Sequence, residues 1–264
     1  MKRNRLTRAL RLVIVAVATF LVPALSLGAW NVPKETISYD VMYKWGLVNK
    51  KAGTVRIVTT PQSNGEFHAH LSGATAKWAD RFYTVRDTLK GRIKSETFLP
   101  LYYEKISHEG GDYEHNVLTY TRSGNTTTAK VTVAKKRKKD KEVKHETKTH
   151  SATGMTIDML SSYYYMRKLD YANMKKGETV AVNVFSGKQK ERLTIHYEGI
   201  ETIEVKNKKY PCYHITFTFT SKNGKKTSDN MDAWISTTPG KIPLLLEGKL
   251  PIGKIRCFYT GTVS

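Results

Sequence analysis

The stretch ISYDVMYKW, residues 37–45, decides the fold because apolar and aromatic side chains alternate in it with polar ones. Successive side chains of an extended chain point to opposite faces, so this period of two predicts a half-buried β-strand. The stretch YHITFTF, residues 213–219, repeats the pattern near the other end of the chain. We therefore expect β structure along most of the sequence.

Further segments alternate in the same way and are separated by short turns. They cover residues 54–60, 66–74, 83–93, 101–107, 113–122, 127–135, 178–185, 191–197, 231–236, 242–249 and 254–259. Gly or Pro stands where a hairpin needs it in QSNGE, RSGNT, SKNGKK and TTPGK. This order predicts a mainly all-β protein: an antiparallel meander curved into an open or partly closed barrel or a sandwich.

One segment, TIDMLSSYYYMRKLD, breaks the rhythm with a helical period. Four of its side chains recur at helical spacing, namely Ile157, Leu160, Tyr164 and Arg167. Thr156 is the expected N-cap, and Asp158 falls in the first turn, where the helix dipole favours an acid. We predict one main helix near residues 156–169, and a brief helical turn in AKWADRFY, residues 76–83.

The first 28 residues are a predicted secretory signal peptide. MKRNRLTRALR carries five basic residues and no acid, and the apolar run LVIVAVATFLVPAL follows it. That run has about 14 residues, fewer than the roughly 20 that a spanning helix needs, and we expect cleavage between Ser26 and Trp30. We predict a single β-rich domain over 29–264, in the periplasm or at the periplasmic face of the outer membrane.

The exported part is strongly basic. Without the five basic residues of the signal peptide, 39 lysines and arginines face 23 acids, a net charge of +16. Such a charge favours anionic surfaces. Export excludes nucleic acid as the partner and leaves an anionic or amphipathic envelope molecule, with peripheral membrane contact. The alternative is that the lysines only keep the protein soluble.

The stretch AKKRKKDKEVKHETKTH, residues 134–150, concentrates this charge. Because strand patterns flank it, we interpret residues 135–148 as a basic hairpin insertion with a solvated tip. The residues expected to contact anionic surfaces are Lys135, Lys136, Arg137, Lys138 and Lys139.

Known catalytic and cofactor patterns find no support in the sequence. His145 and His150 are five residues apart, a spacing that puts them on opposite faces of a strand and off one face of a helix. No phosphate-binding Gly-rich loop and no Gly-x-Ser-x-Gly elbow occurs. We therefore predict no metal site, no cofactor and no catalytic residues.

Two cysteines, Cys212 and Cys257, lie in late predicted strands. An oxidising compartment permits a disulfide between them, provided that their α-carbons approach to within about 7 Å. Alternation argues against the bridge, because Cys212 shares a face with the polar His214 and Cys257 shares one with Ile255. Two buried free thiols are the alternative.

A carboxylate occupies an apolar face in YTVRDTLKGRI, residues 83–93. Asp87 shares that face with Leu89 and Ile93, whereas Arg86 points the other way. A buried carboxylate needs a partner. Because Arg167 lies on the apolar face of the predicted helix, we expect Asp87 and Arg167 to pair and dock the helix onto the sheet, with a ligand head-group site as the alternative.

Aromatic side chains suggest where an apolar ligand would bind. A barrel lined by Tyr39, Tyr43, Trp45 and Trp234 would hold one, together with Asp87 and Arg167, whereas a solid core would not. The leading functional hypothesis is a non-enzymatic envelope protein that binds a hydrophobic or amphipathic molecule. The alternatives are a structural or partner-binding module, an enzyme acting on envelope glycans or lipids through Asp87, and an integral outer-membrane barrel.

Spaced aromatic, Gly and charged positions connect these segments to a known family. The relevant stretches are YDVMYKWGLVNKKAGTV, FYTVRDTLKGRI, TFLPLYY, MLSSYYYMRKL and ISTTPGKIPLLLEGKLPIG. With them the chain resembles domain of unknown function 3108, a family of exported envelope proteins of Gram-negative bacteria, and specifically its Bacteroides-type members. The resemblance implies a β-rich envelope domain and brings no activity, ligand or catalytic residue. The basic hairpin departs from the family pattern.

Overall fold

The computed structural model describes residues 31–187, 189–221, 228, 230–250 and 252–263, so the predicted signal peptide lies outside the described residues. Within them, fifteen strands form one continuous sheet. The strands are β1 Glu35–Trp45, β2 Val48–Pro61, β3 Glu66–Thr75, β4 Val85–Lys94, β5 Pro100–Glu109, β6 Asp112–Ser123, β7 Thr126–Lys136, β8 Lys144–Thr153, β9 Thr156–Asp158, β10 Thr179–Phe185, β11 Lys190–Val205, β12 Lys208–Ser221, β13 Met231–Ser236, β14 Pro243–Lys249 and β15 Lys254–Val263.

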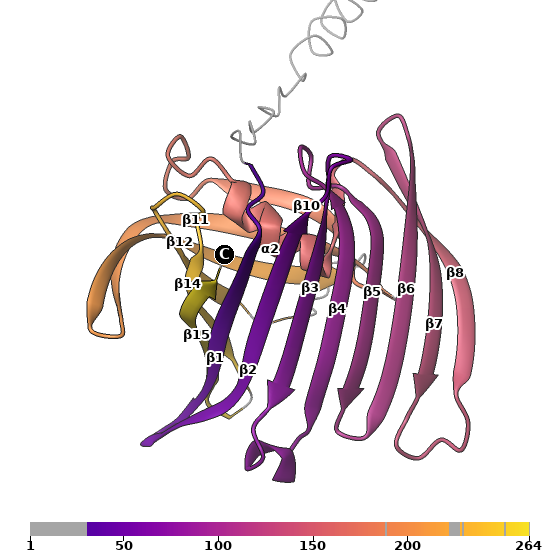
Figure 1. The fold of residues 1–264 in the computed structure, drawn as a ribbon, viewed down its shortest axis with the longest axis horizontal. Helices are drawn as coiled ribbons and strands as arrows, with labels where there is room; N and C mark the ends of the chain where they lie inside the picture. Colours follow the sequence, from indigo (N-terminus) through magenta and orange to yellow (C-terminus); the bar gives the residue numbers. More distant parts are fainter. Residues whose placement is uncertain (1–30, 188, 222–227, 229, 251, 264) are drawn as a thin grey trace, which may run out of the picture.

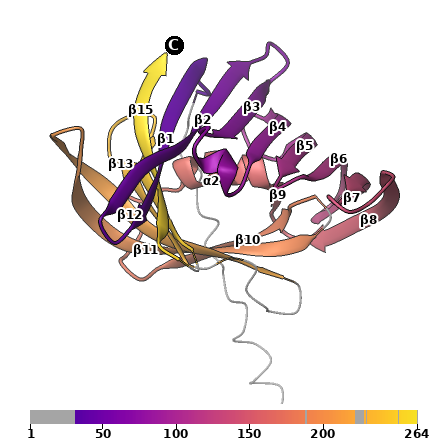
Figure 2. The same cartoon turned by 90° about the horizontal axis from the view of Figure 1, so that it is seen from below.

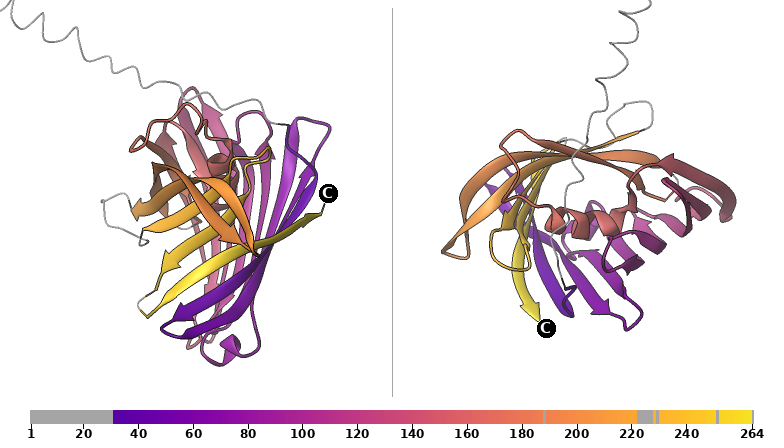
Figure 3. Two further views of the ribbon diagram at one scale, coloured as in Figure 1. Left: turned by 90° about the vertical axis from the view of Figure 1, so that its left-hand side faces the viewer. Right: turned by 90° about the horizontal axis from the view of Figure 1, so that it is seen from above.

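The sheet is a meander that returns to its own beginning. Strands β1 to β8 pair in chain order, β10 to β15 do the same, and β15 pairs antiparallel with β1. The two ends of the sheet are therefore β8 and β9, and the short β9 pairs parallel with β10. Figure 1 shows the tall half formed by β1 to β8, and Figures 2 and 3 show the sheet curling into a nearly closed barrel. The predicted fold class is confirmed.

Side chains, and not strand pairing, bridge the gap between the two sheet ends. His150 Nε2 lies 3.0 Å from the carbonyl oxygen of Gly187, and Asn183 donates to the carbonyl oxygen of Thr153 over 2.9 Å. Lys190 reaches the carbonyl oxygen of Ser151 over 3.5 Å. Since none of these contacts continues a β ladder, the barrel is only partly closed.

The hairpin of β11 and β12 extends beyond its predicted bounds. Pairing continues to Val205 and Lys208, with Lys206 and Asn207 both at positive φ in the turn, as a tight two-residue hairpin loop requires. The register shifts between Tyr197 and Gly199, which reverses the faces of the following residues. That bulge is the reason why the period-two pattern in the sequence ends at residue 197 although the strand continues.

Helix α2, Met159–Lys168, lies inside the curved sheet (Figure 2). The predicted helix is confirmed, but its N-cap is Asp158, which accepts from the backbone N–H of Ser161 over 2.6 Å, and not Thr156, which lies in β9. One core cluster joins the inner faces of β1 to β7 to Leu160 and Tyr164, and a second joins β10 to β13 to Met166. The helix is thus buried all round between the two halves.

One short helical element was also predicted from the sequence. The expected helical turn is the 3₁₀ helix η1, Ala79–Arg81. Among the described residues, the structure has no helix whose length and apolarity would let it cross a membrane.

Candidate functional site

Arg167 points inward, as predicted, but its carboxylate partner is different. The Arg167 side chain is fully buried and its Nη1 lies 2.6 Å from Oε1 of Glu35 at the start of β1. Its Nε and Nη2 donate to the carbonyl oxygen of Gly240 over 3.0 and 2.8 Å. The predicted pair of Asp87 and Arg167 is therefore wrong. Glu35 precedes Ile37 by two residues, so the alternation that placed Ile37 inside could have found it.

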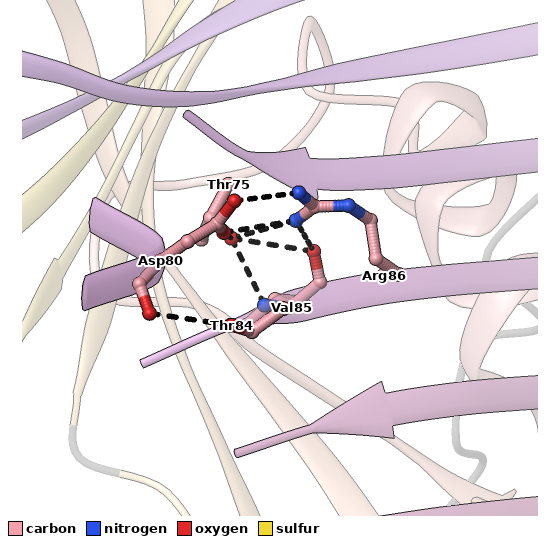
Figure 4. Close-up of polar contacts among 5 residues, drawn as sticks. All are labelled: Thr75, Asp80, Thr84, Val85 and Arg86. Atoms are coloured by element: carbon pink, nitrogen blue, oxygen red, sulfur yellow. Dashed lines mark hydrogen bonds and ion pairs between the residues drawn. The ribbon is translucent and has the colours of Figure 1, made fainter. Parts of the chain in front are cut away.

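Asp87 lies on the inner face of β4, as predicted, and meets Lys105 of β5 at 3.8 Å. Burial raises the pKa of its carboxyl to about 6, and Lys105 opposes that rise. Arg86 points to the other face, where it contacts Asp80 of η1 at 2.7 Å and Thr75 at 2.9 Å (Figure 4). The neighbouring charged residues Arg86 and Asp87 of β4 therefore lie on opposite faces of the sheet.

A groove of about 380 Å³ lies between the two halves of the sheet, beside the start of α2. Its walls are mainly apolar and come from both halves, with Leu89, Tyr103, Met159, Phe219 and Met231. Asp87 and Lys105 stand on the β4 and β5 wall, and Glu191 of β11 stands on the other half. Its volume falls in the range of small-molecule sites, which combine apolar walls with a few polar groups. The arrangement suits a molecule with an apolar part and a polar part.

A smaller polar hollow of about 200 Å³ adjoins the groove through Lys105. Its carboxylates come from Glu109, Asp112 and Glu114. Arg137, at the start of the basic hairpin tip, lies in the same hollow and contacts Asp112 at 2.5 Å. The inner face of β5 and β6 is therefore locally acidic, in contrast to the net charge of the chain.

The basic hairpin predicted over residues 135–148 consists of the end of β7, the connection 137–143 and the start of β8, and it does not present its five basic residues as one surface. Arg137 is held by Asp112, which also accepts from the backbone N–H of Lys138. Lys135 is half-buried and pairs with Lys144 across the two strands. Of the five, the lysines Lys136, Lys138 and Lys139 are exposed.

The four aromatic residues expected to line a ligand site lie apart. Tyr39 is buried, and its hydroxyl lies 3.1 Å from that of Tyr163 on α2. Trp45 is 58% exposed, and Tyr43 donates to the carbonyl oxygen of Ile252. Trp234 stacks on His214 with ring centroids 4.7 Å apart and donates to Glu201. The groove is lined by other residues, which come from strands whose alternation was recognised but whose closeness was not.

Cys212 and Cys257 are free thiols, so the disulfide that the sequence left open is not formed; Cys212 is buried and Cys257 is half-buried. Two strands, β13 and β14, separate the strands that carry them. Neighbouring strands lie about 4.8 Å apart, which puts the two cysteines well beyond bonding reach. Burial raises the pKa of both thiols to about 11.

His145 and His150 face opposite sides of β8, as their spacing indicated. His150 is buried and its pKa is lowered, mainly by that burial. In the part of the chain that the structure covers, no group of three or more His, Cys, Asp or Glu side chains is arranged to hold a metal ion.

The curved meander, its internal helix and the groove define a β-barrel-like protein. The chain belongs to the family described as "Protein of unknown function (DUF3108)", which matches residues 38–259. It is also similar to the crystal structure of a beta-barrel-like protein of domain of unknown function DUF1849 from Brucella abortus, at 8% identity and a TM-score of 0.59. That likeness covers 88% of this chain and 97% of the other, and it shows a shared fold. No curated protein matches the chain.

Proposed function

We propose that this is a non-enzymatic, exported envelope protein that binds an amphipathic molecule in the groove between its two half-sheets. The observation that carries the proposal is the lining of that groove. Apolar side chains of β12, β13 and α2 face a wall that carries Asp87 and Lys105. A solid core would leave no such space, and a purely structural module would need none.

The sequence supports the envelope location that is part of this proposal. The signal peptide pattern and the surplus of basic residues support a periplasmic or outer-envelope site, where amphipathic molecules and anionic surfaces are both available. The exposed lysines of the β7–β8 tip supply the contact with such surfaces, and the groove supplies the binding site for a single molecule.

Isothermal titration of protein expressed from the full chain with 1-monododecanoylglycerol, below its micelle concentration, tests the proposal. We expect saturable binding that Met231→Asp weakens at least tenfold, because a carboxylate would then stand in the apolar wall. Ile200→Asp is the matched control, since Ile200 is 67% exposed outside the groove. Absence of saturable binding, together with an empty groove by native mass spectrometry, would refute the proposal.

An enzyme acting on envelope lipids or glycans is the second candidate, favoured by one observation. Asp87 lines the groove with a pKa raised by burial to about 6, a range that suits proton transfer near neutral pH. If Asp87→Asn keeps the fold and the affinity for 1-monododecanoylglycerol but abolishes a measured hydrolysis of that ester, the protein is an enzyme. Equal slow release of dodecanoate by both forms and by buffer supports a binding protein.

A further inference from the structure

Besides Ser161 Oγ, which lies in the first turn of α2, four polar side chains near the start of α2 have buried atoms without a hydrogen-bond partner among the described residues. These atoms are the hydroxyls of Tyr103 and Tyr120, Oδ2 of Asp158, and Nε and Nη2 of Arg122. Tyr103 and Asp158 are fully buried, and Tyr120 is 8% exposed. We call these four residues the inner polar cluster.

The fold brings the cluster together from three elements. Tyr120 and Arg122 alternate along the inner face of β6, and Tyr103 lies on the neighbouring β5, opposite Leu118. Asp158 ends β9 and caps α2, so it faces these strands from the helix side. The Arg122 guanidinium lies over the Tyr120 ring at 5.7 Å.

The titratable groups of the cluster act on one another. After burial, the charge of Asp158 is the next cause that raises the pKa of Tyr103 and of Tyr120. The same carboxylate acts on Arg122, whose pKa is lowered by burial. Burial raises the pKa of Asp158 itself to about 7.

Two other buried tyrosines, one on α2 and one just after it, have hydroxyl partners within the protein. Tyr164 meets the hydroxyl of Thr59 at 2.8 Å, and Tyr171 donates to the carbonyl oxygen of Met166 over 2.7 Å. Buried polar groups in folded proteins are nearly always satisfied by protein, water or a ligand. The unsatisfied atoms of the inner polar cluster therefore point to an occupant from outside the chain.

The cluster adjoins the groove. Tyr103 belongs to both, since its side chain lines the groove and its hydroxyl is one of the unpartnered groups. Met159, directly after Asp158, lines the groove as well. A molecule whose apolar part lies along Met159, Phe219 and Met231 would bring its polar end to Tyr103, the one cluster residue in the groove lining, with Tyr120, Arg122 and Asp158 buried next to it.

The chemistry of the cluster selects the polar end. At pH 8, above the pKa of Asp158, Arg122 contributes one positive charge and Asp158 one negative charge, so an ionic head group would be attracted by one and repelled by the other. The guanidinium donates, the carboxylate accepts, and the two tyrosine hydroxyls do either. Hydroxyl groups on a neutral molecule satisfy all four because each both donates and accepts.

We propose that Tyr103, Tyr120, Arg122 and Asp158 bind the neutral, hydroxyl-bearing head group of the amphipathic molecule held in the groove. The inference rests on the proposed function and specifies its ligand class. Ordered water is the competing occupant, and the experiment separates the two.

The test compares three probes that share a twelve-carbon chain: neutral 1-monododecanoylglycerol, anionic dodecanoate and cationic dodecyltrimethylammonium. Affinities are measured by isothermal titration at pH 8, below each micelle concentration. We expect the glycerol ester to bind the native protein at least tenfold more tightly than either ion. Tyr103→Phe and Tyr120→Phe each remove only an unpartnered hydroxyl. Each should lower the affinity for the ester fivefold or more and change the affinity for dodecanoate less than twofold.

Charge variants give a second, independent readout. Asp158→Asn keeps a capping side-chain oxygen but leaves Arg122 uncompensated, so the preference should move at least tenfold toward dodecanoate. Arg122→Gln removes the positive charge and should move the preference among the probes toward dodecyltrimethylammonium. These shifts are ratios between probes, so a general loss of stability would not imitate them.

The failures are distinguishable. If no probe binds the native protein, the groove proposal and this inference fall together. If the probes bind without selectivity and the phenylalanine and charge variants change nothing, the groove stands and the head-group site is wrong. A crystal structure with the chain of the ester in the groove and only ordered water at the four side chains would also overturn the inference.

Discussion

The two ends of helix α2 carry buried polar groups that are satisfied in opposite ways. At the C-terminal end, Arg167 is held by Glu35 and by the carbonyl oxygen of Gly240, and Lys241 donates to the carbonyl oxygen of Leu169 over 2.7 Å. At the N-terminal end, Asp158 caps the helix with one oxygen and leaves the other without a protein partner.

This difference separates architecture from binding. The C-terminal end ties α2 to β1 and to the β13–β14 connection, which closes the barrel where β15 returns to β1. Every strong donor of the Arg167 guanidinium meets a protein acceptor there, so no ligand is needed. The N-terminal end borders the groove, and there Asp158 and Arg122 have buried polar atoms without a hydrogen-bond partner among the described residues. The first is a structural joint and the second is a site.

The largest expected effect is at the structural joint. Glu35→Gln leaves the Arg167 charge buried without its carboxylate, and removing one partner of a buried pair costs about 3–5 kcal/mol of unfolding free energy. Urea denaturation followed by circular dichroism measures it. The double variant Glu35→Leu with Arg167→Met is the control and should recover part of the loss, since apolar replacement of both partners removes the unpaired charge. A loss below about 1 kcal/mol for Glu35→Gln would contradict the structural role.

The second prediction concerns the pH dependence of stability at the other end. The folded pKa of Asp158 is about 7, against an ordinary value of 3.8, so the folded state binds a proton more readily than the unfolded state. Its contribution is present at low pH and is lost as pH rises through 7, roughly 2–3 kcal/mol between pH 5 and pH 8. The Asp158→Asn variant should lack this pH-dependent contribution. The difference in unfolding free energy between the native protein and the variant should therefore change by that amount from pH 5 to pH 8. If the unfolding free energies of the two proteins depend on pH in the same way, the pKa of Asp158 is not raised by burial in the folded state.

The third prediction compares two tyrosines. Tyr164→Phe removes the partner of the fully buried Thr59 hydroxyl and should cost about 1–2 kcal/mol of unfolding free energy. Tyr120→Phe removes a hydroxyl without a protein partner and should change stability by less than about 0.5 kcal/mol in ligand-free protein. Thermal and urea unfolding of both variants measure the difference. Equal losses would mean that the inner polar cluster is satisfied within the folded chain.

The structural joint could be predicted only in part from the sequence. The alternation of apolar and polar residues shows on which face of the sheet a side chain lies, but it does not show which side chain it contacts. It placed Asp87 and Arg167 inside, and both lie inside. Their pairing depends on where α2 crosses the sheet, and the closure of β1 on β15 brings Glu35 to Arg167 instead. Pairings between distant strands are set by sheet curvature, which no local period records.

The groove and the inner polar cluster could not be predicted for a related reason. Tyr120 and Arg122 were inside a recognised strand, and Asp158 inside a recognised helical segment, yet each alone resembles an ordinary surface or capping residue. Only the fold shows that Asp158 faces β5 and β6, and that the wall of Leu89 and Tyr103 lies opposite Phe219 and Met231. Short motifs report local chemistry, whereas this site is assembled from segments far apart in the chain.

The smallest effect on stability is expected at the β7–β8 tip, which contrasts with both ends of α2 because its charges are exposed. Replacing Lys136, Lys138 and Lys139 with serine should change the unfolding free energy by less than about 0.5 kcal/mol. Each lysine near an anionic membrane contributes about 1 kcal/mol to binding. The affinity for phosphatidylglycerol vesicles, measured by co-sedimentation, should therefore fall at least tenfold at low salt, and little at high salt, where the charges are screened. The control Lys175→Ser, Lys176→Ser and Lys208→Ser removes the same charge from exposed positions elsewhere. If the control weakens vesicle binding equally, net charge and not the hairpin tip directs the protein to the surface.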